Sequence, residues 1–89
     1  MLENKFVIIN PTGFHTRPIR ALVDTATDDF PDCEVKIVKG DRTINGKSLI
    51  HMLTLGIKYQ DEITVRVEGA REAEALETLG AFFGKIYKE

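Results

Sequence analysis

Residues 63–68 read Ile-Thr-Val-Arg-Val-Glu and decide the fold class, because apolar and polar side chains alternate there without a break. Successive side chains of a β-strand point to opposite faces, so this pattern predicts a strand with one buried and one solvated face. Shorter β-prone runs occur at residues 6–9, 34–37 and 42–44, and they are bounded by clusters of turn formers. The sequence therefore predicts four short strands.

Three further segments show helical periodicity. The first is predicted to begin near His15 or Thr16, and its apolar residues, three and four positions apart, are Ile19, Leu22, Val23 and Ala26. A short second helix is expected after Ser48, with Leu49, Met52 and Leu53 on its apolar face and its end at Gly56. The third is predicted over residues 70–87, with an apolar stripe at Ala73, Leu76, Gly80 and Phe83 that Leu79, Ile86 and Tyr87 widen.

The element order βαββαβα predicts an α+β fold. We expect an open-faced β-sandwich, in which a four-stranded antiparallel sheet carries all three helices on one face and leaves the other face in water. The polar strand residues expected on the open face are Glu34, Lys36, Thr64, Arg66 and Glu68. With 89 residues and no linker or repeat, the chain is predicted to form a single domain over residues 1–89.

Composition excludes several classes of function. The net charge is −2, and acidic and basic residues are spread evenly, which argues against nucleic-acid binding. The one cysteine, Cys33, excludes an internal disulfide, and His15 and His51 lack neighbours at metal-ligand spacing, so no metal or cofactor is expected. No apolar run reaches the roughly 18–20 residues that cross a bilayer, and the N-terminus does not resemble a signal peptide. We expect a soluble cytoplasmic protein without membrane insertion.

The segment Gly13-Phe14-His15-Thr16-Arg17-Pro18 holds the strongest indication of chemistry. The unpaired amides at a helix N-terminus favour an anion, so a phosphoryl group on His15 would meet N–H donors there, and Arg17 could pair with its oxygens. Thr12 and Thr16 are candidates to support the phosphate. From these residues alone, three interpretations stay open: a capping or exposed histidine, an anion site, and a metal or acid–base role.

A second motif narrows these alternatives. Gly46-Lys47-Ser48-Leu49-Ile50-His51 continues as Met-Leu-Thr-Leu-Gly-Ile, and together with residues 13–18 it resembles the histidine-containing phosphocarrier (HPr) family of the bacterial phosphoenolpyruvate-dependent sugar phosphotransferase system. The resemblance covers nearly the whole chain. It implies the open-faced sandwich fold, phosphorylation of His15, and assistance by Arg17. It also implies phosphoryl transfer from enzyme I to the IIA components of sugar permeases, in a relay and not as a stand-alone enzyme.

The resemblance also implies a docking surface built from the first two helices. Its candidate residues are Arg20, Lys47, Leu49, Ile50, His51 and Leu53, with apolar side chains ringed by basic ones. A monomer is expected, because one face must meet successive partners. Ser48 is either a helix cap or a serine phosphorylated by a regulatory HPr kinase.

The chain departs from the family where Ile19-Arg20 replaces two alanines. An alternative function is therefore an HPr-like regulatory module, controlled by phosphorylation and binding, for example, a transcription regulator. A carrier for a nitrogen or dihydroxyacetone branch is a further alternative.

Overall fold

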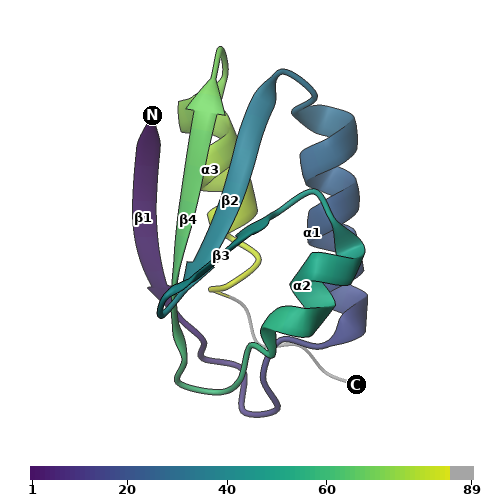
Figure 1. Cartoon of the computed structure of the whole chain (residues 1–89), viewed down its shortest axis with the longest axis vertical. Coiled ribbons are helices and arrows are strands. Elements are labelled where there is room, and N and C mark those ends of the chain that lie inside the picture. The colour runs from purple at the N-terminus through teal and green to yellow at the C-terminus, as the bar shows by residue number, and fades with distance from the viewer. Residues whose placement is uncertain (85–89) are drawn as a thin grey trace.

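The computed structural model describes residues 1–84 of the chain (Figure 1). In chain order, its elements are β1 (Leu2–Val7), α1 (Thr16–Asp29), β2 (Cys33–Lys39), β3 (Arg42–Asn45), α2 (Leu49–Leu55), β4 (Glu62–Gly69) and α3 (Glu72–Gly80). This is the predicted βαββαβα order. None of these helices is long and apolar enough to cross a membrane.

The strands form one antiparallel sheet in the order β1-β4-β2-β3, so β4 lies between β1 and β2. Ile63, Val65 and Val67 of β4 are fully buried, as their alternation predicts. The three helices cover the face of the sheet to which these side chains point (Figure 1). The open-faced sandwich predicted from the sequence is therefore confirmed.

The opposite face of the sheet carries the predicted polar side chains, with one difference. Glu34, Lys36 and Glu68 are exposed, and Arg66 pairs with Glu3 of β1 at 3.1 Å. Thr64, however, retains only 9% exposure. It lies on the inner strand β4, where side chains of the strands on both sides flank it and exclude most of the water.

The sequence predicts the first strand at residues 6–9, but β1 lies earlier in the chain. It begins at Leu2 and ends at Val7, and it pairs with β4 from Leu2↔Val67 to Val7↔Glu62. Residues 3–5 are polar and gave no apolar signal, but β1 is an edge strand, where polar side chains remain in water while the backbone pairs. Ile8 follows the strand and is buried, whereas Ile9 is exposed.

α2 buries part of the expected face, and Leu55 takes the place of Leu53 in it. Met52 and Leu55 are buried and Leu49 is half-buried, but Leu53 remains 44% exposed. α2 packs against α1 on one side and β3 on the other, and this orientation turns Leu55 into the core instead of Leu53. Gly56 ends the helix in the left-handed conformation with φ 67°, as predicted.

α3 is shorter than predicted, and of its predicted stripe Leu79, Gly80 and Phe83 are buried and Leu76 is half-buried. The helix spans Glu72–Gly80, and the predicted extension over residues 85–87 lies outside the described residues. Ala75, Leu79 and Gly80 are buried, whereas Ala73 is exposed. α3 packs closely against β1, since a Cβ on Gly80 would lie 2.4 Å from the Phe6 ring.

Candidate functional site

The loop before α1 is held by the buried side chain of Asn10. Its Nδ2 donates to the carbonyl of Gly13 at 2.6 Å and to Oγ1 of Thr12 at 3.1 Å. The Gly13 N–H donates back to the Asn10 carbonyl at 2.9 Å. Gly13 has φ +86°, a conformation that L side chains rarely adopt. These bonds fix the chain just before His15. Sequence reasoning assigned Asn10 only to a turn and missed this role.

Replacing Asn10 with alanine is expected to lower the free energy of unfolding by about 1–3 kcal/mol, because the buried Gly13 carbonyl would lose its donor. Chemical denaturation measures the change. Asn4→Ala is the matched control: the Asn4 side chain is exposed and, within residues 1–84, accepts only from the neighbouring Lys5 amide, so its effect should stay within about 0.5 kcal/mol. Equal effects of the two substitutions would contradict the role of Asn10.

His15 is the N-cap residue of α1, with φ −84° and ψ 176°, and its side chain makes no capping hydrogen bond. Its Nε2 is buried and has no hydrogen-bond partner among the described residues. The imidazole is therefore not a satisfied structural histidine. Because Nε2 is shielded from solvent, Nδ1 is the ring nitrogen that remains for an incoming group.

The first turn of α1 leaves backbone donors open beside His15. The Ile19 N–H bonds to the His15 carbonyl at 3.0 Å, but within residues 1–84 no acceptor bonds the N–H of Thr16 or Arg17. Pro18 has no N–H, and the first turn holds no acidic side chain. The positive end of the helix dipole is therefore uncompensated and favours an anion. The Arg17 side chain is exposed in the same turn.

A surface pocket of about 280 Å³ adjoins His15. It brings together both predicted phosphate-supporting residues, Thr12 and Thr16, and Leu53 of α2. Its other lining residues are Phe14, Ile19, Gly56, Ile57 and Lys58. The Phe14 N–H donates to the Ile57 carbonyl at 3.2 Å, so the two loops that form the pocket contact each other directly. Among the described residues, the pocket lining contains hydroxyls and a cation but no carboxylate.

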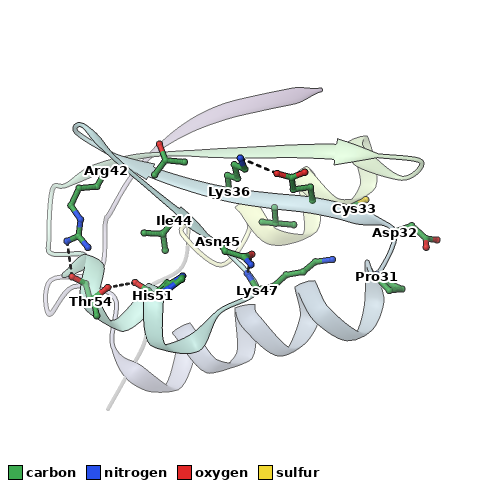
Figure 2. A pocket seen from close by; sticks show the side chains of 13 residues that line it. Pro31, Asp32, Cys33, Lys36, Arg42, Ile44, Asn45, Lys47, His51 and Thr54 are labelled. Atoms are coloured by element: carbon green, nitrogen blue, oxygen red, sulfur yellow. Dashed lines mark hydrogen bonds and ion pairs between the residues drawn. The ribbon is translucent and has the colours of Figure 1, made fainter.

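The predicted docking residues separate into two groups. Ile50 is 73% exposed and Leu53 44%, and Arg20 is exposed on α1. Lys47 instead donates through Nζ to the Phe30 carbonyl at 2.7 Å, at the end of α1 opposite His15. His51 and Lys47 line the same groove (Figure 2). This groove lies between the β2–β3 hairpin and α2. The structure does not bring Lys47 and His51 to the His15 pocket.

Ser48 is the N-cap of α2, as its position predicts. Its Oγ accepts from the His51 N–H at 3.3 Å, and the residue is half-buried. A cap of this kind satisfies a donor that the helix cannot satisfy itself. The adjacent Ile50 is far more exposed, so a charge placed on Ser48 would lie close to an apolar surface.

Lys39 and Asp61 hold the second loop of the pocket. Lys39 Nζ lies 2.8 Å from Asp61 Oδ2 and also donates to the Gly56 carbonyl at 2.8 Å. Asp61 Oδ2 additionally accepts from the Lys58 N–H at 2.7 Å. The hydrogen bond from Lys39, then that from Lys58, lowers the pKa of Asp61 below its usual 3.8, against a smaller opposing effect of burial. No sequence pattern links Lys39 to Asp61, since only the fold brings them together.

The depressed pKa of Asp61 predicts a small pH-dependent stabilisation. A carboxyl with a lower pKa in the folded chain stabilises the fold above its unfolded pKa, and this contribution is lost as the pH falls through the folded pKa, below 3.8. Asp61→Asn should therefore destabilise the protein at neutral pH, by less than about 1 kcal/mol at this partly exposed site, and flatten the acid decline. Denaturation at several pH values measures both effects. An Asp61→Asn curve parallel to that of the original protein would contradict the prediction.

Comparison with known proteins agrees with this geometry. Residues 2–85 match the family model described as the PTS HPr component phosphorylation site. The phosphocarrier protein HPr of Chlamydia muridarum (strain MoPn / Nigg) is 34% identical over 84 residues, which covers 94% of this chain and 79% of that protein.

Two solved structures of HPr from Thermoanaerobacter tengcongensis are also similar. HPr-C-His has a TM-score of 0.84 and 30% identity, covering 98% of this chain and 100% of its own. A structure described as an HPr dimer has a TM-score of 0.71 and 30% identity, covering 94% of each chain. On the strength of the family model and the curated relative, the chain belongs to the HPr family of phosphocarrier proteins of the phosphotransferase system.

Proposed function

We propose that His15 accepts a phosphoryl group from phosphorylated enzyme I and passes it to IIA components of sugar permeases. One observation carries the assignment: His15 begins α1 beside the two open amides of Thr16 and Arg17, with one ring nitrogen shielded and the other left for reaction. Membership of the HPr family supports phosphotransfer as the general activity. The donor, the acceptor and the cytoplasmic location are parts of the proposal.

The transfer step needs no group other than the imidazole. The lone pair of Nδ1 attacks phosphorus, and the bond from phosphorus to the donor atom of enzyme I breaks, leaving its electron pair on the donor. Nε2, which is buried and faces no hydrogen-bond partner among the described residues, takes no part in this bond exchange. The reverse step delivers the phosphoryl group to the IIA component by the same bond exchange.

Residues of the first turn would stabilise the transferred charge. The N–H groups of Thr16 and Arg17 point from the helix N-terminus, and the Arg17 guanidinium can pair with two phosphoryl oxygens at once. The Thr12 hydroxyl, which accepts from Asn10, retains its own O–H for donation, and Thr16 contributes a second hydroxyl to the pocket. Phosphoryl transfer depends chiefly on such positioning and charge complementarity.

We propose that partners dock on the exposed apolar residues Ile50 and Leu53 beside the His15 pocket. Arg20 and Arg17 on α1 would supply the basic rim for acidic partners. One such face serves a monomer that meets enzyme I and a IIA component in turn.

The carrier assignment is tested by incubating the protein with phosphoenolpyruvate and enzyme I. We expect a gain of one phosphoryl mass that is labile in acid and stable in base, followed by its loss when an IIA component is added. A protein that takes up no label under these conditions would overturn the proposal.

Ser48 favours one alternative, a regulatory module whose phosphorylated form binds a different protein. Its hydroxyl lies at the start of α2, two residues from the most exposed apolar side chain of that helix. A phosphate there would add up to about two negative charges beside the proposed docking surface. The IIA experiment separates the two functions, since only the carrier passes its phosphoryl group on.

A further inference from the structure

We propose that Lys58 is a second phosphate-binding cation, which contacts the phosphoryl group on His15 from the loop between α2 and β4. The inference rests on the proposed carrier function and adds a residue to the same site. Neither the motif around His15 nor the motif around Ser48 includes Lys58.

The loop that carries Lys58 touches the loop that carries His15. A Cβ built on Gly13 would lie 3.1 Å from the Ile57 carbonyl oxygen and 3.3 Å from Cα of Lys58. The Phe14 N–H bonds to the same carbonyl at 3.2 Å. Lys58 and His15 both line the pocket, and within residues 1–84 Lys58 is the only Lys, Arg, Asp or Glu that lines it.

The backbone of Lys58 is fixed while its side chain stays in solvent. Its N–H donates to Asp61 Oδ2 at 2.7 Å, and its carbonyl accepts from the Asp61 N–H at 3.0 Å. The residue itself is exposed. A lysine anchored in this way can move its ammonium through the pocket without moving the loop, and each ammonium offers three donors.

Asp61 is the carboxylate with which the Lys58 side chain could form an ion pair, but its Oδ2 already contacts Lys39 and the Lys58 N–H. Lys39 Nζ lies 2.8 Å from that oxygen, and Lys58 forms no ion pair with any residue in the described part of the chain. Among the causes that lower the pKa of Asp61, the charge of Lys58 is the smallest, so Lys39 is the main partner of that carboxylate and the Lys58 ammonium can turn into the pocket. An anion in the pocket would meet the open amides of α1 on one side and this cation on the other.

The test compares Lys58→Met with Lys36→Met. The control removes the same charge from the open face of the sheet, where Lys36 pairs with Glu34. Each variant is phosphorylated with phosphoenolpyruvate and enzyme I, separated from enzyme I, and titrated by ³¹P NMR. Loss of a neighbouring cation should move the phosphoryl titration of Lys58→Met to higher pH, while Lys36→Met titrates like the original protein. Lys58→Arg should retain the original titration.

The rate of phosphorylation by enzyme I gives a second readout. We expect kcat/KM to fall by about threefold to tenfold for Lys58→Met, as the loss of one charge-assisted contact predicts. A Lys58→Met protein that matches Lys36→Met in both measurements would overturn the inference and leave the carrier function intact. A slower reaction with an unchanged titration would also overturn it, since Lys58 would then contact enzyme I. Failure of the original protein to accept any phosphoryl group would instead reject the carrier function itself.

Discussion

Replacing His15 with alanine is expected to abolish phosphoryl acceptance from enzyme I. The substitution removes the nucleophilic nitrogen, and no other histidine lies in the pocket lining. The open amides of Thr16 and Arg17 would remain, but they bind an anion without forming a bond to phosphorus. Intact-protein mass spectrometry after incubation with phosphoenolpyruvate and enzyme I measures the result, which should be no gain of a phosphoryl mass.

His51→Ala is the matched control, because His51 is the second histidine and lies in the groove between the hairpin and α2 (Figure 2). It should still accept one phosphoryl group per chain. His15→Ala should remain folded, with a free energy of unfolding within about 0.5 kcal/mol of the original, since the His15 side chain makes no capping bond. Uptake of label by a folded His15→Ala protein would refute the assignment of His15.

Replacing Arg17 with alanine should reduce kcat/KM for phosphorylation by enzyme I by about tenfold to a hundredfold. This range corresponds to the loss of a hydrogen bond to a charged group in the transition state. Arg17 is exposed in the first turn of α1 and forms no ion pair within residues 1–84, so its removal costs little stability. Stopped-flow or quench-flow kinetics with phosphorylated enzyme I provides the measurement.

Two further variants make the Arg17 result specific. Arg17→Lys keeps the charge but loses the planar pair of donors, so its rate should fall between those of the original and Arg17→Ala. Arg66→Gln removes a positive charge from the open face of the sheet, where Arg66 pairs with Glu3, and should react at the original rate. Equal losses for Arg17→Ala and Arg66→Gln would show that only the net charge matters, contrary to the role proposed for Arg17.

The strands and the first helix could be predicted because their signals are local. Alternation at residues 63–68 specified β4, and the spacing from Ile19 to Ala26 specified the buried face of α1. The starts of α1 and α2 could also be predicted, because the turn formers before His15 and the cap residue Ser48 are local signals. β1 was placed too late, because on an edge strand the backbone pairs whatever the side chains are.

Short helices were harder to orient, since their periodicity allows more than one buried face. α2 buries Leu55 and exposes Leu53 because it packs between α1 and β3. The seven residues of the helix do not by themselves determine this packing. α3 buries Leu79 and Gly80 as predicted, but it buries Ala75 and leaves the predicted Ala73 exposed. In both helices, neighbours distant in the chain selected the face.

Residues near His15 in the chain revealed where a phosphoryl group could be held, since a helix start, an arginine and a proline occupy consecutive positions. Contacts between segments far apart in the chain added the remaining parts of the pocket, namely Leu53 and Lys58 beside His15 and the Lys39–Asp61 pair behind them. They also directed Lys47 and His51 away from it. The physical reason is range: backbone dihedrals and side-chain periodicity act within a few residues, whereas burial and charge pairing depend on which distant side chains the folded sheet brings together.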